Sequence, residues 1–314
     1  MTLLLLKIAA GFVLLYFGGE ALVRGAEAIA TRFGLSPLVI GLTVVAFGTS
    51  SPELFVSLSA AGDGHGDVAI GNAVGSNICN LALVLGLAAA IRPIQVEAQL
   101  MRFDAPILIV CCLLLILLLT DGSLAQVDGL ILTTLIITYV GISLWLARRD
   151  AAVLEPEFEQ SMHTATPLYL AVIYVALGLG MLIYGAELFV GASVEVARSV
   201  GISEALIGLT LVAIGTSLPE LATTIVASLK GRGDIAVGNA VGSSIFNILA
   251  ILGITAVVMP VDQGDIEMLD LLVMVAFAVV LVPMLFSRRS LSRTEGVLLM
   301  VGYFLWLGWV TTGK

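Results

Sequence analysis

The sequence predicts an all-α, polytopic membrane protein with ten transmembrane helices, arranged as two inverted repeats of five helices each. Three observations carry this prediction: long apolar segments recur along the chain, charged residues are scarce, and the second half repeats the first. Of the 314 residues, 59% are hydrophobic and only 12% are charged, and the mean hydropathy is +1.11. A soluble domain of this length needs a larger polar surface than these charges provide.

Each apolar segment of about 18 residues or more is long enough to cross the ~30 Å hydrocarbon core of a bilayer as a helix. We therefore expect a very high helix content and no sheet. The three cysteines, of which Cys111 and Cys112 are adjacent, are expected to be small residues of the membrane core rather than a disulfide framework. The ten expected spans are residues 2–23, 37–60, 67–90, 104–120, 127–147, 167–191, 204–229, 234–258, 269–286 and 295–312.

Basic residues are distributed unevenly between the two classes of loop that ten spans create. Basic side chains near helix ends remain on the cytoplasmic side during insertion. One class of loop carries eleven basic residues, whereas the opposite class and the termini carry only Arg198, Lys7 and Lys314. Both termini are therefore predicted outside. The eleven residues predicted inside are Arg24, Arg32, Arg92, Arg102, Arg148, Arg149, Lys230, Arg232, Arg288, Arg289 and Arg293.

The second half of the chain repeats the first at a fixed offset of 167 residues. Residues 41–86 and 208–253 align without a gap and are identical at 26 of 46 positions, including Pro, Glu, Asn, Ser and Thr. Five spans per copy is an odd number, so the second copy must enter the membrane upside down. This symmetry is typical of secondary transporters, which hold their substrate near the midplane between the halves. We expect repeat 1 at residues 1–150, a cytoplasmic linker at 151–166 and repeat 2 at 167–314.

The first repeated motif, Gly-Thr-Ser-x-Pro-Glu, brings hydroxyls and a carboxylate onto one helix face. Thr49 and Ser50 precede Glu53 by four and three residues, which is the spacing of neighbours on a helix. Pro52 has no N–H to donate to the carbonyl one turn earlier, at Gly48, so backbone oxygen is freed at membrane depth. The second copy of this arrangement consists of Gly215, Thr216, Ser217, Pro219 and Glu220.

The two glutamates predict a site for a mobile cation. An ionised carboxylate at the bilayer centre costs at least ~2.5–3.5 kcal/mol. Glu53 and Glu220 lie well inside their spans, and no Lys or Arg lies at matching depth. Oxygen ligands suit hard cations such as Ca²⁺, which takes six to eight of them. The alternative role is proton carriage, because two nearby carboxylates repel one another when both are ionised.

The second repeated motif places polar residues at intervals of four on one helix of each repeat. Asn72, Ser76 and Asn80 form one stripe, and Asn239, Ser243 and Asn247 form the other. Hydrogen bonding between helices is an equally good explanation for Asn72 and Asn239. The neighbouring glycines, Gly71, Gly75, Gly238 and Gly242, are expected to let helices approach closely.

These paired motifs, Gly-Thr-Ser-x-Pro-Glu and Gly-Asn-x-x-Gly-Ser-x-x-x-Asn, resemble the alpha repeats of the cation/calcium exchanger superfamily. The similarity to prokaryotic sodium/calcium exchangers extends over nearly the whole chain. It implies that spans 2, 3, 7 and 8 form a central core with one calcium site flanked by sodium sites. It also implies that spans 1 and 6 slide against that core, and that the protein resides in a prokaryotic cell membrane.

The resemblance also implies individual ligands. Glu53 and Glu220, with the carbonyls of Thr49 and Thr216, correspond to calcium ligands. Asn80 and Asn247 form the remaining central pair, and some prokaryotic members have Asp in place of Asn247. Asparagine at both positions also resembles the calcium/proton exchangers of the superfamily, so the counter-ion is left open. The residues corresponding to sodium ligands are Ser50, Ser76, Ser217 and Ser243, with the carbonyls of Ala46 and Ala213.

The leading hypothesis is therefore a secondary antiporter that exchanges Ca²⁺ for Na⁺, with a Ca²⁺/H⁺ exchanger as the alternative. A cation channel is disfavoured by the inverted repeat, and no further motif supports an enzyme. No cofactor is expected, because Ca²⁺ and Na⁺, or H⁺ as the alternative, are transported ions. The expected partners are inorganic cations and membrane lipid, with no nucleic acid and no obligatory protein partner evident.

Overall fold

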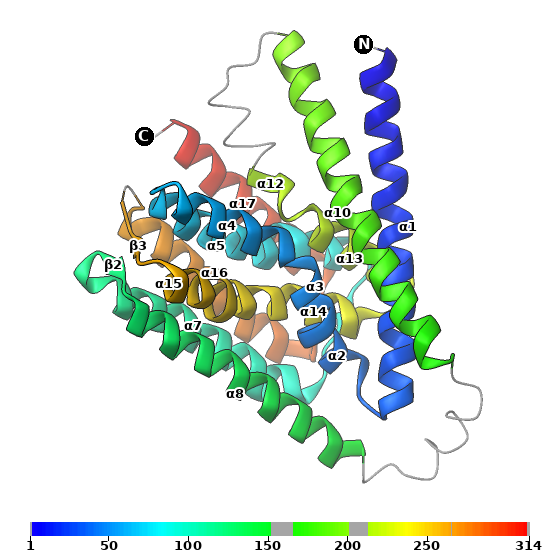
Figure 1. Ribbon diagram of the computed structural model, residues 1–314. Helices are drawn as coiled ribbons and strands as arrows, with labels where there is room; N and C mark the ends of the chain where they lie inside the picture. The colour runs from blue at the N-terminus through cyan, green and yellow to red at the C-terminus, as the bar shows by residue number, and fades with distance from the viewer. Residues whose placement is uncertain (1, 152–165, 201–212, 265, 313–314) are drawn as a thin grey trace.

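The chain forms a helical bundle whose long helices have the length and composition of membrane spans (Figure 1). The computed structural model describes residues 2–151, 166–200, 213–264 and 266–312. Within these residues, eight helices can cross a membrane, and a bent pair of helices forms a ninth span. The span expected at 204–229 appears as a shorter apolar helix, Leu218–Leu229, because its first part, 204–212, lies outside the described residues. Most of the expected linker, 152–165, also lies outside them.

The helices of the first half follow the predicted order. Their bounds are α1 Thr2–Phe33, α2 Pro37–Ile40, the π-helix η1 Gly41–Val45, α3 Ala46–Thr49, α4 Ser51–Gly62, α5 Gly66–Ile78, the π-helix η2 Cys79–Val84, α6 Leu85–Ile91, the π-helix η3 Leu100–Asp104, α7 Ala105–Leu118, the 3₁₀-helix η4 Leu119–Asp121 and α8 Gln126–Ala151.

Within its described residues, the second half repeats this order at an offset of 167 residues, except that η3 and η4 have no counterpart there. Its helices are α10 Leu168–Ser199, α12 Ala213–Gly215, α13 Leu218–Leu229, α14 Gly233–Phe246, the π-helix η6 Asn247–Leu252, α15 Gly253–Val258, α16 Met268–Arg288 and α17 Arg293–Thr312.

The expectation of no sheet is wrong in detail, because four two-residue strands pair in the loops between spans. They are β1 (Ile94–Gln95), β2 (Ser123–Leu124), β3 (Val261–Asp262) and β4 (Ser290–Leu291). β1 pairs with β4 and β2 with β3, both antiparallel, which satisfies backbone groups of loops that lie side by side. Under the 167-residue offset β1 corresponds to β3 and β2 to β4, so the two sheets exchange places. This is the arrangement that two inverted repeats produce.

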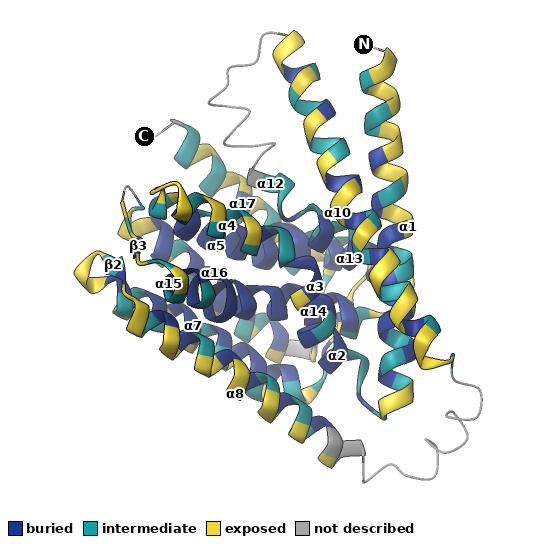
Figure 2. Ribbon diagram, viewed as in Figure 1, coloured by how far each residue is buried: buried dark blue, intermediate teal, exposed yellow. Residues whose placement is uncertain are grey.

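The centre of the bundle is formed by the third and eighth spans. In the most apolar window of α5–α6 78% of residues are buried, and in that of α14–α15 83%, against 17–39% for the other long spans. Figure 2 shows the same contrast, with dark blue central helices and yellow outward faces on α1, α7, α8 and α10. The exposed residues on these outer helices include Leu3, Phe12, Leu117 and Tyr184, which suit a lipid environment.

Two long helices, α1 and α10, run side by side and extend beyond the rest of the bundle (Figure 1). Glycines allow this close approach: a Cβ added to Gly18 would lie 3.0 Å from the Gly178 carbonyl oxygen, and one added to Gly11 would lie 2.8 Å from that of Gly185. Gly178 and Gly185 follow Gly11 and Gly18 by 167 residues. The two crossings are therefore related by the repeat.

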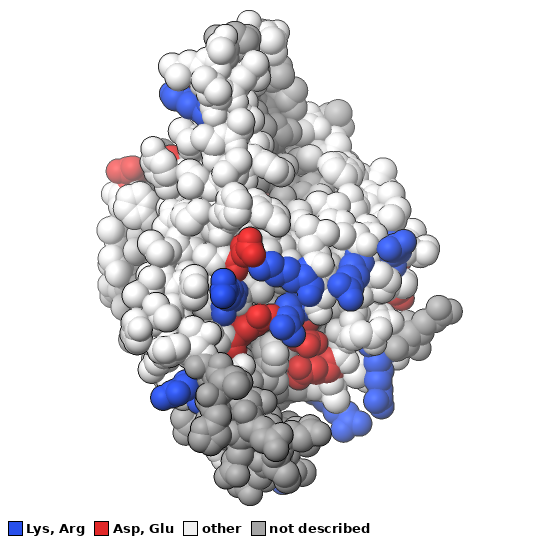
Figure 3. Space-filling view, turned by 90° about the vertical axis from the view of Figure 1, so that its right-hand side faces the viewer, with Lys and Arg blue, Asp and Glu red and all other residues white. Residues whose placement is uncertain are grey.

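Both of these helices are longer than the spans predicted to end at residues 23 and 191. α1 continues to Phe33 and α10 to Ser199, so Arg24 and Arg32 lie on a helix rather than in a loop. The added turns are polar enough to end the apolar segment but contain no proline that would end the helix. Ion pairs join α1 to the end of α13: Lys230 Nζ lies 2.8 Å from Glu20 Oε1, and Arg232 pairs with Glu27. This face of the molecule carries basic and acidic side chains next to one another (Figure 3).

Substituting Gly178 by Leu is expected to lower the thermal stability of the protein, because a side chain there collides with the backbone of α1, 2.6 Å from Leu22 N. Gly180→Leu is the matched control, since a Cβ at Gly180 meets nothing within 4 Å. Melting temperatures in detergent should fall for the first variant and stay unchanged or rise for the second. Equal stability of the two variants would refute the packing of α1 on α10.

Candidate cation-binding site

Two helices are broken at the repeated Gly-Thr-Ser-x-Pro-Glu motif. α3 ends at Thr49 and α4 begins at Ser51, with a bend of 43° between the two segments of the span. Ser50 at the break has φ −82° and ψ 6°, and Ser217, between α12 and α13, has φ −87° and ψ 7°. Both following helices have Pro within their first two positions, where the missing N–H leaves a carbonyl of the preceding turn without its helical donor. Both copies of the motif therefore interrupt their helix, where the sequence predicted a freed backbone oxygen.

The two glutamates that follow these breaks are buried. Glu53 is 1% exposed and Glu220 is 0% exposed, and each lies in the first turn of its helix. Their carboxylates interact electrostatically with one another. Ser50 Oγ donates a hydrogen bond of 3.1 Å to Glu220 Oε1, and the repeat-related Ser217 neighbours Glu53. Among the described residues neither carboxylate has a Lys or Arg within ion-pair distance.

Asn72 and Asn239 tie the helices around this pair together. Asn72 Nδ2 donates to the Glu53 carbonyl (3.2 Å) and to Ser57 Oγ (3.1 Å). Asn239 Nδ2 donates to the equivalent groups of the other repeat, the Glu220 carbonyl (3.3 Å) and Thr224 Oγ1 (3.0 Å). Hydrogen bonding between helices, one of the two interpretations of these asparagines, is thereby confirmed.

Each asparagine also accepts a hydrogen bond from the threonine of the opposite repeat. Thr49 Oγ1 donates to Asn239 Oδ1 at 3.1 Å, and Thr216 Oγ1 donates to Asn72 Oδ1 at 3.5 Å. The Thr49 hydroxyl also lies 3.4 Å from Ser243 Oγ. The threonine hydroxyls are therefore used in fixing the two motifs against each other, which leaves their carbonyls, rather than their side chains, as candidate ligands.

Of the 16 buried polar side-chain atoms without a hydrogen-bond partner among the described residues, eight belong to predicted site residues. An unsatisfied buried polar group is rare in a native protein and calls for an explanation such as a bound ion or water. All of these site atoms are oxygens except one amide nitrogen, which is the donor set of a hard-cation site. In the described part of the chain they are both carboxylate oxygens of Glu53, Glu220 Oε2, Ser76 Oγ, Ser217 Oγ, Asn80 Oδ1 and Nδ2, and Asn247 Oδ1.

The remaining predicted ligands differ in how far the structure describes them. The Ala46 carbonyl accepts from Ser50 N at 3.0 Å and from Thr49 Oγ1 at 3.3 Å, so it would share its oxygen between these donors and an ion. Ser243 is buried and belongs to the Thr49–Asn239 network. Ala213 opens α12, and only its backbone is described.

One polar pair at the centre is absent from the sequence-based prediction. Asn77 Nδ2 donates to the Ser244 carbonyl at 3.1 Å, and Asn247 Nδ2 donates to Asn77 Oδ1 at 3.0 Å. Asn77 and Ser244 are repeat-related, and each follows a predicted ligand directly. The sequence offered one indication, a polar residue at both position 77 and position 244. Only the hydrogen bond between the repeats shows that Asn77 orients Asn247.

A cavity of about 470 Å³ leads from the N-terminal end of α5 to the candidate site residues. Its walls include Asp67 and Asp270 near the loops predicted outside, and Asn72, Ser76 and Thr216 at depth. Asp67 and Ser76 are nine residues apart on α5, so the path covers roughly 14 Å.

In the second repeat, the equivalent glycines of α14 are covered by backbone instead of facing a cavity. A Cβ on Gly238 or Gly242 would lie 2.8 Å from backbone of residues 38–42, whereas one on Gly75 has no described atom within 4 Å. The expected packing role therefore holds for Gly238 and Gly242, while Gly71 and Gly75 line the cavity.

A membrane bundle with this duplicated core and buried oxygen-rich centre has the features of a multi-pass cation transporter. The sequence model of the sodium/calcium exchanger protein family matches residues 3–145 and, a second time, residues 170–312. The chain therefore belongs to the sodium/calcium exchanger family. The two matches correspond to the two repeats.

Individual relatives cover nearly the full chain. It is 37% identical to the inner membrane protein YrbG of Escherichia coli, covering 98% of this chain and 96% of the relative. It is 31% identical to the sodium/calcium exchanger MaX1 of Methanosarcina acetivorans, covering 98% of both chains. Among solved structures, the sodium-calcium exchanger NCX_Mj soaked with 10 mM Na⁺ and 10 mM Sr²⁺ matches with a TM-score of 0.84 and 31% identity, covering 98% of this chain and 99% of that one.

Replacing Asn239 by Ala is expected to destabilise the protein by about 1–3 kcal/mol, because it removes a partner from buried groups of Glu220, Thr224 and Thr49. Asn72→Ala is the matched comparison. Asn72 lines the cavity, so water can replace part of its hydrogen bonding and the loss should be smaller. Thermal unfolding of both variants in the same detergent tests this order, and a larger loss for Asn72→Ala would contradict the difference in burial.

Proposed function

We propose that the protein is a secondary antiporter that exchanges Ca²⁺ for Na⁺ across a prokaryotic cell membrane by alternating access, with both termini outside. The observation that carries this proposal is the buried pair of Glu53 and Glu220, which lie close to one another without a Lys or Arg partner among the described residues. Two ionised carboxylates balance one divalent cation. The family relationship and the matching NCX_Mj structures support Ca²⁺ and Na⁺ as the cations.

The donor set supports two kinds of site. Glu53 and Glu220, with the carbonyls of Thr49 and Thr216, would bind Ca²⁺, which prefers several oxygens including carboxylates. Neutral oxygens suited to Na⁺ would come from serine hydroxyls and backbone carbonyls, and the amides of Asn80 and Asn247 would complete the coordination shell of the central cation. The serines are Ser50, Ser76, Ser217 and Ser243, and the carbonyls are those of Ala46 and Ala213. Competition for the same carboxylates would couple the ions. More than one Na⁺ would then return per Ca²⁺. Two Na⁺ per Ca²⁺ would leave the cycle electroneutral, and any other ratio would make it electrogenic.

The unequal burial of the two repeats supports alternating access. The cavity reaches Ser76 and Asn72 from the side predicted outside, while α14 packs on residues 38–46 and covers Asn239 from the other side. With the termini outside, as proposed, this would be an outward-facing arrangement. Because the two motifs are nearly identical, exchange of these environments between the repeats would produce an inward-facing state of similar energy.

A Ca²⁺/H⁺ exchanger is the second candidate, and one observation favours it. Asn80 and Asn247 place amides where an acidic residue would add a third negative charge, so the central site has only two carboxylates to be neutralised. Two protons could achieve this as well as sodium ions. The distinction requires ⁴⁵Ca²⁺ uptake into proteoliposomes with the Na⁺ and pH gradients imposed independently. A sodium gradient that leaves calcium flux unchanged would overturn Na⁺ as the counter-ion.

Glu53→Gln and Glu220→Gln should each reduce exchange to background, since either change leaves one carboxylate to balance a divalent ion. Side-chain volume and burial are preserved, so expression and gel-filtration behaviour should remain close to wild type. Glu187→Gln is the control, because Glu187 is exposed on α10. Exchange retained by either core variant would refute the site.

Asp67→Asn is expected to raise the external Ca²⁺ concentration for half-maximal exchange several-fold without changing the maximal rate. A carboxylate at a cavity mouth concentrates cations, and this effect is screened by salt. The difference from wild type should therefore shrink as ionic strength rises. Asp63→Asn removes the same charge from the preceding exposed loop and should have a smaller effect. Identical shifts for the two variants would exclude a specific role for the cavity wall.

A further inference from the structure

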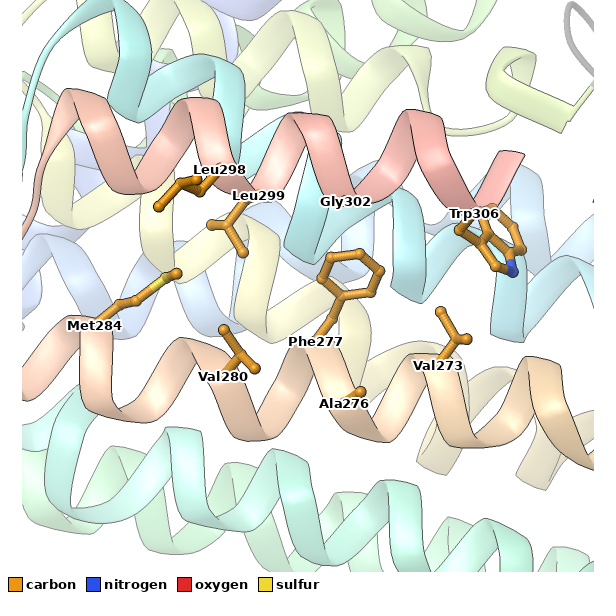
Figure 4. Close-up of a pocket in the computed structure, with 9 residues that line it drawn as sticks. All are labelled: Val273, Ala276, Phe277, Val280, Met284, Leu298, Leu299, Gly302 and Trp306. Atoms are coloured by element: carbon orange, nitrogen blue, oxygen red, sulfur yellow. The ribbon is translucent and has the colours of Figure 1, made fainter. Parts of the chain in front are cut away.

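An apolar groove of about 400 Å³ lies between α16 and α17, and none of the candidate cation ligands lines it (Figure 4). In the view of Figure 4 the two helices run side by side, and side chains from both point into the space between them. The lining is apolar except for one indole nitrogen, so the groove is unsuited to ordered water, which needs several polar partners. The lining residues are Val273, Ala276, Phe277, Val280, Met284, Leu298, Leu299, Gly302 and Trp306.

One residue that lines the groove, Gly302, differs from its counterpart in the first repeat. A Cβ added to Gly302 would lie 3.1 Å from the Phe277 ring, so Phe277 occupies the space that a side chain on α17 would fill. The repeat-related residue, 167 positions earlier, is Leu135 on α8. The first repeat therefore has a leucine where the second has a glycine covered by the Phe277 ring.

The length and depth of the groove fit one hydrocarbon chain. Val273 and Met284 are eleven residues apart on α16, which corresponds to roughly 16 Å along the helix. One leaflet contributes about half of the ~30 Å hydrocarbon core. Both helices qualify as membrane spans, so the groove opens at the depth where acyl chains are the surrounding solvent.

Positive charge lies at one end of the groove. α16 ends and α17 begins next to Arg289 and Arg293, beyond the Met284 and Leu298 end, and both arginine side chains are exposed. Arg293 Nη2 donates to the Ile91 carbonyl at 3.3 Å, which holds this guanidinium near the helix start. The nearby Glu295 accepts from Ser292 N and Oγ, at 2.8 and 2.6 Å. Guanidinium groups recognise phosphate through paired N–H donors.

We propose that this groove binds one acyl chain of an anionic phospholipid, whose phosphate is held by Arg289 and Arg293. Trp306 gives the site a link to transport, because it lines both this groove and the cavity that leads to Ser76. A bound chain therefore supports one wall of the ion pathway from the lipid side. The site stands independently of which ions the protein exchanges.

The fluorescence of Trp306 can also report whether a lipid chain occupies the groove. The other two tryptophans, Trp145 and Trp309, are replaced by Phe, and the protein is reconstituted with lipids carrying brominated acyl chains, which quench tryptophan on contact. At equal mole fractions, brominated phosphatidylglycerol should bind at Trp306 about fivefold or more in preference to brominated phosphatidylcholine, because each arginine near an anionic headgroup contributes ~1 kcal/mol.

Further variants distinguish a specific lipid-binding site from general contact with lipid. Arg289→Gln with Arg293→Gln should abolish the preference, whereas Arg24→Gln with Arg149→Gln, which removes two basic residues from other helices, should preserve it. Gly302→Leu, which copies the residue of the first repeat, should reduce quenching by both lipids. If that variant does not fold, Val280→Phe fills the same groove from α16. Equal quenching by both lipids, or a preference that survives loss of Arg289 and Arg293, would overturn the proposal.

Discussion

The structure is organised around two carboxylates that are buried without a basic residue beside them. Removing an ionised carboxylate from water is costly unless it is paired and hydrogen-bonded, and Glu53 and Glu220 share one small region. The chain supplies a neutral framework instead: Ser50 bonds to Glu220, and Asn72 and Asn239 bond to the carbonyls of the two glutamates. This framework fixes the positions of the carboxylates while leaving most of their oxygen atoms without a protein partner.

The cross-repeat hydrogen bonds explain how one motif used twice yields a single centre. Thr49 contacts Asn239, Thr216 contacts Asn72, and Asn77 contacts both Ser244 and Asn247. Each half therefore completes the other, and neither carries a finished site alone. The two halves nevertheless differ in exposure, since α5 borders the cavity and α14 packs against residues 38–46. A near-symmetric sequence in an asymmetric conformation fits the alternating-access cycle proposed above.

The outer helices are held together by different contacts from those of the core. α1 and α10 meet through small residues at Gly11, Gly18, Gly178 and Gly185, a contact that relies on close backbone approach rather than on interlocking side chains. The ion pairs of Glu20 and Glu27 join α1 to the end of α13 at the polar part of the molecule. Between α16 and α17 the second repeat departs from the first, with Gly302 in place of a leucine, and there the bundle presents a groove to lipid.

The sequence alone determined the membrane class, the duplication, the disturbance of the helices at Pro52 and Pro219, and the position of Glu53 and Glu220 inside apolar spans, because hydropathy, repeat offset and proline chemistry are local properties. It did not reveal that α1 and α10 continue to Phe33 and Ser199, since their polar turns resemble loops by hydropathy while remaining helical. The paired strands, the Asn77–Asn247 contact, the one-sided cavity and the groove beside Gly302 all arise from segments far apart in the chain. Only the tertiary structure decided them, because identical motifs can be buried or exposed depending on what packs against them.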